Sequence, residues 1–530
     1  MKLNYKRTLL VGFAFFLICM FWQAYDTVMP LILTNKFGMA QTWSGAIMAL
    51  DNVLALFMLP FFGALSDKCA SKRGKRTPFI VIGTILAAAL FIGISVIDAK
   101  QLTKLEDVTP DKYESSLSVI YDADPVVTQK AETKDGMSFA EAIKDVFAEG
   151  KKQHLSEIFP EKSEFTSIKM YDENNKLTDG YTNYVVPARN AYAWQKTAQS
   201  PAALIFFILL LLAVLVSMGI FRSPAVALMP DVTPKPLRSK ANAIINLMGS
   251  FGGILVLVLG MIFKTGSANN ALMNYIPFFC TISVLMIVSL VIFRLTVKEP
   301  VWAAEAARIN DELDKENKEE EKKGDGKLSK AERRSLIFIL ASVALWFMGY
   351  NAVSSKYSVY AGSVLGMDYN LTLIIGQAAA IISYLPIGII SSKIGRKKAI
   401  MAGVIMLTTV FVLAAFLRSD SSVILMNILF AFAGVSWATI NVNSYPMVVE
   451  LATGSNVGKY TGYYYTASMA AQVVTPILSG IFLDIKLTTL FPYAAVFTAI
   501  AFITMLNVKH GDSKPQPKKS VLENFDVDGD

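Results

Sequence analysis

Long apolar stretches alternate with short charged loops along the whole chain. A helix of about 20 apolar residues spans the hydrocarbon core of a bilayer. Stretches of that length predict twelve transmembrane helices, six on each side of a charged central segment. The first six cover residues 9–33, 43–65, 77–97, 202–226, 241–263 and 271–293. The second six cover residues 335–360, 371–390, 399–417, 422–447, 460–483 and 490–508.

Composition supports this prediction. The chain has 530 residues, of which 53% are hydrophobic and 17% charged, whereas about a quarter of the residues of a soluble domain are charged. The three cysteines do not lie in the long polar segments, so no disulfide framework is expected. The predicted fold class is therefore an all-α membrane protein.

The net charge of +8 first suggests a nucleic-acid partner, but the basic residues gather in alternate loops. They precede the first predicted helix or follow the second, fourth and eighth. These residues are Lys2, Lys6, Arg7, Lys68, Lys72, Arg73, Lys75, Arg76, Lys235, Arg238, Lys240, Lys393, Arg396, Lys397 and Lys398. Basic loops remain on the cytoplasmic side of membranes. The charge therefore predicts a multi-pass protein of the cell membrane with both termini in the cytoplasm, and no nucleic-acid partner.

Two polar segments interrupt the membrane pattern. Residues 99–200 follow the third helix and are expected outside the cell as a small α/β insert. A capping box from Ser138 to Glu141 predicts a short helix ending near residue 149. Runs of aromatic and β-branched residues at 165–171 and 181–187 predict two strands. The second segment, residues 296–334, is rich in Glu and Lys and predicts a solvated cytoplasmic helix that joins the halves.

These boundaries divide the chain into two six-helix halves. The domains are residues 1–98 with 201–295, the insert at 99–200, the linker at 296–334, the second half at 335–510 and a disordered tail at 511–530.

The two halves repeat each other in sequence. At a shift of 325 residues, Gly63, Ser66 and Lys68 correspond to Gly388, Ser391 and Lys393. At a shift of 219 residues, Asp231 and Lys240 correspond to Glu450 and Lys459, at equivalent places in the predicted topology. Parallel six-helix repeats, related by an axis along the membrane normal, are an architecture of transporters.

The loop after the second helix reads Gly-Ala-Leu-Ser-Asp-Lys from Gly63, then Gly-Lys-Arg-Thr-Pro-Phe from Gly74. A glycine, an acid and a basic cluster in this place resemble the signature of the major facilitator superfamily. The resemblance implies that Asp67 pairs with basic groups and closes a cytoplasmic gate. The alternative is that the basic residues only set the topology. The gate candidates are Gly63, Asp67, Lys68, Arg76, Arg222, Asp231, Arg238, Lys393, Arg396, Glu450 and Lys459.

The resemblance can be narrowed to one branch of the superfamily. Arg222-Ser223-Pro224, followed by Ala-Leu-Met-Pro-Asp from Ala227, is similar to glycoside–pentoside–hexuronide cation symporters and sucrose transporters. The chain departs from that pattern because its fourth helix lacks the membrane-embedded aspartate that sucrose transporters carry before this arginine. The resemblance covers both halves and leaves out the insert.

Four charged residues fall within predicted membrane helices, where a charge normally faces a cavity or a partner. Asp26 is the principal candidate for proton coupling, and Asp51 is the alternate. The alternative interpretations are that Asp26 is a static partner of Lys356 and that Asp51 forms a hydrogen bond that packs two helices together. Lys356 could also extend to the membrane surface. Arg222 could bind substrate oxygen or belong to the gate with Asp231, and its depth favours the gate.

Sugars bind to aromatic faces, amides and hydroxyl groups, and such side chains occur on the helices expected to line a cavity. The substrate-binding candidates are Trp22, Gln23, Tyr25, Tyr350, Asn351, Lys356, Trp437, Asn441 and Asn443. Ordinary helix packing is the alternative for each aromatic residue.

The function that these features favour is secondary active symport of a sugar or glycoside, driven by protons rather than sodium. The alternatives are a proton-coupled exporter of amphipathic molecules and a transporter-like membrane sensor. A nucleotide-binding Gly-x-x-x-x-Gly-Lys-Ser/Thr loop is absent from the sequence, which argues against ATP drive. The two histidines lie outside the helices, and no metal or nucleophile constellation appears, so an enzyme is not expected. We expect a monomer without cofactor or metal.

Overall fold

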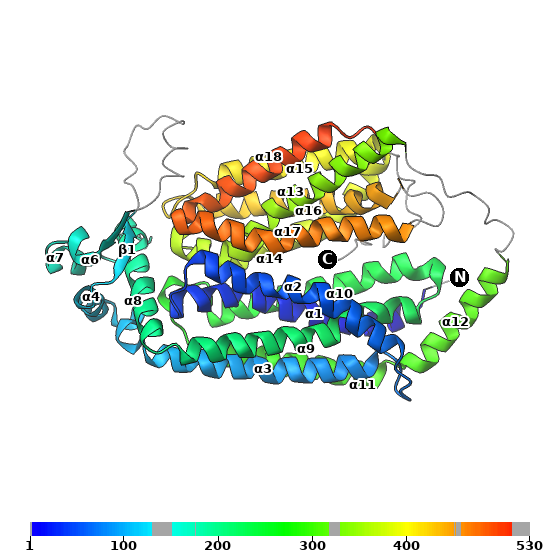
Figure 1. Cartoon of the computed structure of the whole chain (residues 1–530), viewed down its shortest axis with the longest axis horizontal. Coiled ribbons are helices and arrows are strands. Elements are labelled where there is room, and N and C mark those ends of the chain that lie inside the picture. The colour runs from blue at the N-terminus through cyan, green and yellow to red at the C-terminus, as the bar shows by residue number, and fades with distance from the viewer. Residues whose placement is uncertain are drawn as a thin grey trace.

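The computed structural model describes residues 3–129, 151–174, 176–316, 329–449, 451 and 457–510. In this part of the chain, the helix bundle consists of two groups of six helices that lie one above the other (Figure 1). The first half contains α1 Tyr5–Leu31, α2 Gln41–Asp67, α3 Thr77–Thr103, α9 Ala202–Val232, α10 Arg238–Phe263 and α11 Ile276–Thr296. The second half contains α13 Lys330–Tyr360, α14 Tyr369–Ile394, α15 Arg396–Ala414, α16 Val423–Val449, α17 Val457–Ile485 and α18 Leu490–Leu506.

Eleven helices in the described ranges are long and apolar enough to cross a membrane. The remaining helix of the bundle, α14, has 26 residues, and its apolar segment is Tyr369–Tyr384. These helices stand at the twelve predicted places, and the all-helical membrane fold predicted from the sequence is confirmed.

The repeat is visible in local backbone geometry. The first helix of each half ends in a five-residue π-helix, η1 Ile32–Lys36 and η7 Ala361–Leu365. A glycine with positive φ follows each one, Gly38 at 65° and Gly366 at 63°. A side chain at Gly38 would also collide with the backbone of the insert, because its Cβ would overlap a carbonyl oxygen there.

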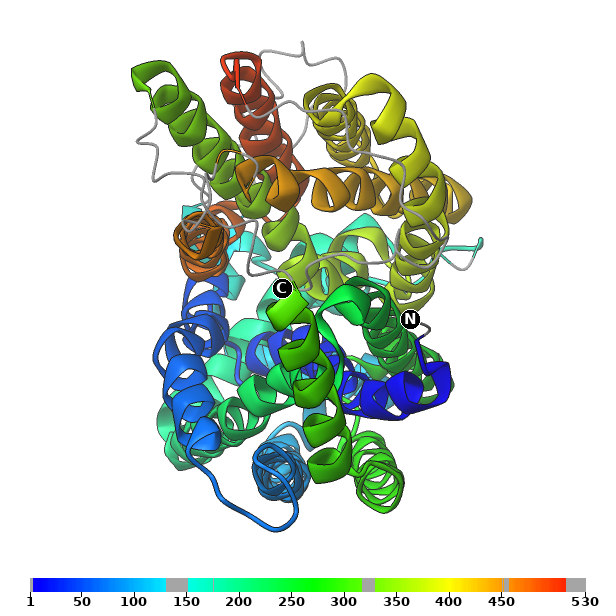
Figure 2. The ribbon, with the colours of Figure 1, turned by 90° about the vertical axis from the view of Figure 1, so that its right-hand side faces the viewer.

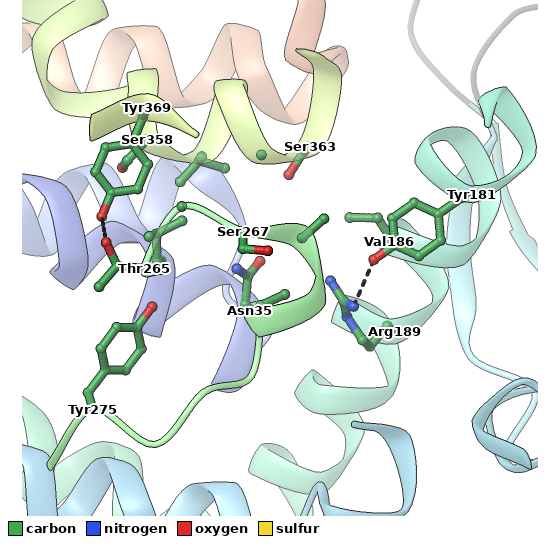
Figure 3. Close-up of a pocket in the computed structure, with 16 residues that line it drawn as sticks. Asn35, Tyr181, Val186, Arg189, Thr265, Ser267, Tyr275, Ser358, Ser363 and Tyr369 are labelled. Atoms are coloured by element: carbon green, nitrogen blue, oxygen red, sulfur yellow. Dashed lines mark hydrogen bonds between the residues drawn. The ribbon is translucent and has the colours of Figure 1, made fainter. Parts of the chain in front are cut away.

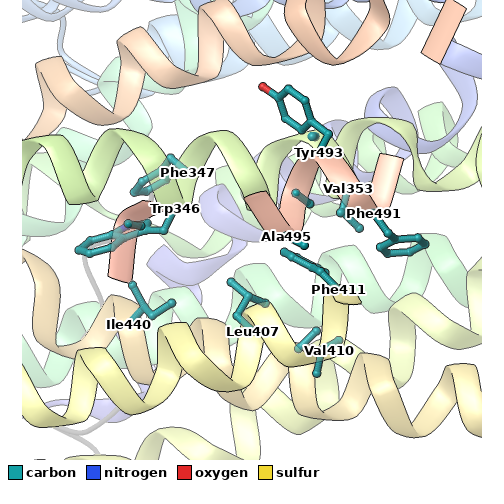
Figure 4. Close-up of a cluster of buried hydrophobic side chains, with 14 of the residues drawn as sticks. Trp346, Phe347, Val353, Leu407, Val410, Phe411, Ile440, Phe491, Tyr493 and Ala495 are labelled. Carbon is teal, nitrogen blue, oxygen red and sulfur yellow. The ribbon is translucent and has the colours of Figure 1, made fainter. Parts of the chain in front are cut away.

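Each half has its own hydrophobic core. Figure 4 shows part of the core of the second half, where aromatic side chains such as Trp346 and Phe411 pack between α13, α15 and α18. Both side chains are almost fully buried. The halves meet along two seams related by the repeat, α2 against α17 and α10 against α14, and α1 packs against α13 between them. Since each half is packed internally, the seams are the surfaces along which the halves can separate.

The helix bundle has two distinct ends. We call the end that carries the insert the insert end and the opposite end the basic-loop end, because the loops rich in Lys and Arg lie there. Helix α12, Glu299–Glu316, extends along the basic-loop end (Figures 1 and 2). In the view of Figure 2, toward this end, the second half forms the upper group and the first half the lower group, with α12 in front of the first half.

The insert is a small domain of helices and one two-stranded sheet. Strands β1 Val126–Gln129 and β2 Lys151–His154 pair antiparallel. Around them lie 3-10 turns η2 Glu106–Val108 and η3 Pro110–Lys112, helices α4 Tyr113–Asp122, α6 Leu155–Ile158, α7 Lys162–Thr166 and α8 Val186–Gln199, and π-helix η4 Tyr181–Val185. The insert has its own core, which includes Leu117, Leu155 and Phe165.

The two predicted strands of the insert are wrong. Residues 165–171 contain the end of α7 and a single bridge from Tyr171 to Leu177, and residues 181–187 are helical. Pro187 lies at the start of α8, directly after π-helix η4, so a helix runs through the residues predicted as a strand. The buried side chains of Tyr181 and Val185 pack as a helical face, so tertiary packing overrides their strand propensity. The predicted helix from Ser138 lies outside the described residues.

The charged linker differs from the prediction in its first turns. Residues 299–316 form helix α12 as expected, but Trp302 and Ala306 are buried against the first half. Arg7 stacks over the Trp302 ring at 5.4 Å and forms an ion pair of 2.6 Å with Glu305. The start of the linker is thus a fixed part of the first half and is not a solvated helix.

Candidate functional site

The centre of the first half contains three charged residues and one tryptophan from three helices, which we call the central cluster: Asp26, Asp51, Arg222 and Trp22. Asp26 is ten residues from the end of η1, and Asp51 is ten residues from the start of α2. At 1.5 Å per residue, each lies about 15 Å from the insert end, halfway through a bilayer. Both carboxylates are half-buried, and the charge of Arg222 acts on both. The Arg222 guanidinium stacks over Trp22 at 5.5 Å.

This position revises the assignment of Arg222 to the gate. The sequence suggested that the fourth helix ends near residue 226, whereas α9 continues to Val232. Arg222 therefore lies about 15 Å from the end of its helix, where it faces the two carboxylates.

The two carboxylates differ in their hydrogen bonds. Asp51 Oδ1 accepts from the backbone N–H of Asn52 at 2.6 Å and from its side-chain amide at 2.7 Å. Asp26 accepts none from the described residues. Hydrogen bonds to a carboxylate favour its ionised form, so Asp26 is the carboxylate more available for a proton.

Several predicted substrate residues have buried polar atoms without a partner among the described residues. These atoms are Trp22 Nε1, Tyr25 Oη and Asn351 Nδ2. On the second half, the rings of Tyr350 and Trp437 stack in parallel with centroids 3.7 Å apart. Buried polar atoms normally have hydrogen-bond partners, so these three groups are available to a solute or to water.

The other predicted substrate residues are placed differently. Gln23 accepts a hydrogen bond of 2.6 Å from Gln377 of α14, which joins the halves. Asn443 is buried and donates to Thr439 of its own helix at 2.9 Å. Asn441 is half-buried on the same helix. Asn443 therefore serves helix packing, and Gln23 belongs to the seam.

A second cluster closes the insert end, and we call Gln41, Thr42, Lys356 and Asp484 the insert-end cluster. Asp484, at the end of α17, accepts from the backbone N–H groups of Gln41 at 2.5 Å and Thr42 at 2.8 Å. The Thr42 hydroxyl donates to the same carboxylate at 2.5 Å. Asp484 thus caps the N-terminus of α2 across the seam, where the helix dipole also favours a negative charge.

Lys356 completes this cluster. Its side chain is fully buried, and Nζ donates to the backbone oxygen of Gln41 at 3.1 Å. It does not extend to the surface, and its hydrogen-bond partners lie on α2 rather than on Asp26. The assignment of Lys356 to substrate binding is accordingly replaced by a contact between the halves. Sequence reasoning missed Asp484, because it resembles an ordinary polar residue after a helix and lies 443 positions from Gln41.

A third cluster lies at the basic-loop end and is built around Arg76, so we call Ser66, Asp67, Arg76, Asp231 and Glu299 the basic-loop cluster. The Arg76 guanidinium forms ion pairs with Asp67 at 2.5 Å and with Asp231 at 2.7 Å. It also donates to the Ser66 hydroxyl. Burial alone would lower the pKa of Arg76, but the hydrogen bond and charge of Asp231, aided by Asp67, outweigh burial and raise it.

Glu299 of α12 holds the same loop from the other side. Its carboxylate accepts from the backbone N–H groups of Arg76 and Thr77, each at 2.8 Å. Glu299 is buried, and Gly74, with φ of 107°, leaves room for it. A Cβ at Gly74 would overlap the Glu299 carboxylate. The glycine is therefore required by this close approach as well as by its backbone angle.

The remaining predicted gate residues lie around these loops. Gly63 lies against Ser223, to which a Cβ would approach within 3.0 Å. Arg238 donates to the backbone oxygen of Pro230 at 2.9 Å. Lys68 and Lys393 are exposed, and Arg396 is half-buried. Lys459 lies in the first turn of α17, and Glu450 lies outside the described residues.

The structure also contains an ion pair that sequence reasoning did not single out. Lys36 and Asp98, both fully buried, form an ion pair of 2.6 Å at the insert end of the first half. Lys36 Nζ also donates to the backbone oxygen of Met273 at 2.6 Å. The signal that the sequence offered for this ion pair was an acid, Asp98, at the end of an apolar run. Among the described residues, no group of three or more His, Cys, Asp or Glu is arranged to hold a metal ion.

Comparison with known proteins identifies the family. A model described as "Major Facilitator Superfamily" matches residues 192–383 and 369–525, which together exceed half of the chain. The chain belongs to the major facilitator superfamily. A second model, described as "MFS/sugar transport protein", matches residues 10–98. Membership makes the chain a multi-pass membrane transporter and not an enzyme.

Individual members of the superfamily are similar to this chain over short segments or in fold alone. Sucrose transport proteins SUC4 and SUC3 of Arabidopsis thaliana are 39% and 38% identical over 63 and 68 residues. These segments span only 12% and 11% of the two relatives.

Solved structures match nearly the whole chain. The inward-open xylose transporter XylE from E. coli has a TM-score of 0.56 at 14% identity, covering 98% of this chain and 99% of that one. A point mutant of the nucleoside transporter NupG has a TM-score of 0.52 at 13% identity, covering 95% and 100%. At such low identity these similarities establish the fold only.

Proposed function

We propose that this transporter carries a sugar or glycoside together with protons, by alternating access. The observation that supports the proposal is the central cluster, in which two half-buried carboxylates share one guanidinium. Ionisable groups inside a membrane are costly and are typical of ion pathways and proton relays.

The charges of the central cluster favour coupling to one proton. Two ionised carboxylates and Arg222 carry a net charge of −1, so one proton makes the cluster neutral. A neutral cluster can be closed off from water without the cost of burying a net charge. Asp51 already accepts two hydrogen bonds, and we therefore assign the proton to Asp26.

The substrate is expected between the central cluster and the second half. Trp22 Nε1, Tyr25 Oη and Asn351 Nδ2 are free to donate to hydroxyl groups, and the stacked Tyr350 and Trp437 offer an aromatic face. A sugar presents both hydroxyl groups and an apolar ring face. The "MFS/sugar transport protein" match and the short similarity to sucrose transport proteins favour the same class.

We further propose that the basic-loop end faces the cytoplasm of a cell-membrane protein that works as a monomer. Basic loops remain in the cytoplasm, so both termini would lie there and the insert would lie outside. The insert-end cluster would then make this conformation inward-facing. Protonation and substrate binding would occur after that cluster opens.

The test uses Asp26→Asn in liposomes. In this variant the cluster is neutral without a proton, so the closed state remains accessible. We expect it to exchange labelled sugar by counterflow, while pH-driven accumulation is lost. Asp420→Asn, which changes an exposed acid outside the helices, is the matched control and should accumulate sugar normally.

Two outcomes would contradict the assignment. If Asp26→Asn accumulates sugar fully while Asp51→Asn does not, the proton belongs to Asp51. If both variants accumulate sugar as the unchanged protein does, coupling through these carboxylates is wrong. Counterflow of amphipathic compounds but of no sugar would favour an exporter instead.

A further inference from the structure

A small pocket lies at the insert end, where the insert meets both halves (Figure 3). Arg189 and Tyr181 come from the insert, Asn35 and Ser267 from the first half, and Ser363 from the second half. Figure 3 shows the Arg189 guanidinium directed toward the space between Tyr181, Asn35 and Ser267. The pocket therefore exists only while these three parts of the protein are together.

Arg189 is unusual because it is a buried charge that has no counter-ion among the described residues. Its exposed fraction is 5%. Nη1 donates to the Tyr181 hydroxyl at 3.2 Å, and Nε is buried with no hydrogen-bond partner. No carboxylate within the described ranges forms an ion pair with Arg189, and none of the described residues lining the pocket is Asp or Glu. Buried charges in proteins are normally paired, so a negative charge is missing from this site.

We propose that this pocket binds a small inorganic anion of the size of chloride. The free space inside is about 30 Å³, which is enough for about two water molecules and therefore for one halide ion. It is too small for a sugar. The Arg189 guanidinium supplies the charge, and its Nε–H is a free donor. The Ser363 hydroxyl of the second half, which lines the same side of the pocket in Figure 3, supplies a second donor.

Binding of the anion has a consequence for conformation. The walls come from α8 and η4 of the insert, from the first half near η1, and from α13 and η7 of the second half. An anion that contacts all three favours the state in which they are in contact. The anion therefore stabilises the closed insert end, independently of the solute that the transporter carries.

The test compares the thermal stability of the purified full-length protein in chloride, bromide and gluconate at equal ionic strength. Gluconate is too large for the pocket. For the unchanged protein, we expect chloride and bromide to raise Tm by about 1–3 °C, with saturation. Arg189→Gln should lose this halide-dependent rise. Lys196→Gln removes a cation on the same helix that stacks on Tyr192 outside the pocket, and it should keep the rise.

Equal Tm in halide and gluconate for the unchanged protein would overturn the proposal, as would an undiminished rise in Arg189→Gln. Should Arg189→Gln fail to fold, equilibrium binding of radioactive chloride to the unchanged protein decides. One saturable site per chain, weakened at least threefold by Ser363→Ala, supports the proposal. A linear, non-saturable uptake of chloride overturns it.

Discussion

The insert-end cluster can be tested by replacing one carboxylate. Asp484→Asn removes the negative charge that caps α2 across the seam between the halves. The asparagine oxygen can still accept one hydrogen bond, but it cannot match three charge-assisted ones. We expect the closed insert end to lose stability relative to the open one, because Asp484 and α2 separate when the halves do.

The size of the effect follows from the contacts. Loss of an N-cap costs about 0.5–2 kcal/mol, and a charge at a helix N-terminus contributes about 0.3–1 kcal/mol. Asp484 is exposed to solvent, so the lower part of this range applies. We expect a change of about 1 kcal/mol, which is roughly a fivefold rise in the ratio of open to closed protein.

The assay is a distance measurement between spin labels at the insert end. Labels at Asn269 and Ser422, in a cysteine-free background, place one probe on each half. Asp484→Asn should increase the population at the longer distance about fivefold relative to the unchanged protein. Asp420→Asn is the matched control, because only the backbone oxygen of Asp420 accepts the Lys176 hydrogen bond. Identical distance distributions for Asp484→Asn and the unchanged protein, or an equal shift in the control, would refute the reasoning.

Two further predictions concern the other ion pairs. Arg76→Ala removes the shared partner of Asp67 and Asp231, so uptake per molecule at the cell surface should fall at least about fivefold. Arg73→Ala changes an exposed residue of the same loop and should leave uptake normal. Equal uptake by both variants would argue against the basic-loop cluster as a gate. Asp98→Asn leaves buried Lys36 without its counter-ion and should destabilise the protein by about 3–5 kcal/mol, seen as a lower Tm in detergent. The double change Lys36→Met with Asp98→Leu should recover most of that loss, and a double variant no more stable than Asp98→Asn would contradict the explanation.

The helices could be predicted from the sequence because a bilayer leaves few alternatives. Apolar runs of sufficient length form spanning helices whatever their partners are. The secondary structure of the insert was harder to predict, since aromatic and β-branched residues fit either a strand or the buried face of a helix. Pro187 at the start of α8 was the signal against a strand.

Some of the functional clusters could be predicted from the sequence and others could not, for a physical reason. Arg76 and Asp67 are nine positions apart and belong to one loop motif, so local sequence indicated their contact. Asp26 and Asp51 were found because any acid within an apolar run is unusual. The contact between Asp484 and Gln41 depends on how two halves meet, and no local pattern records it.

The buried Glu299 has a practical consequence for dividing the protein. Its carboxylate is bound to the backbone of Arg76 and Thr77, and Trp302 is buried against the same half. A cut in the chain at the end of α11 would separate Glu299 from that half and leave two backbone N–H groups without an acceptor. To produce the halves as two co-expressed polypeptides, the first should therefore end after Glu316, so that α12 remains with the helices on which it folds.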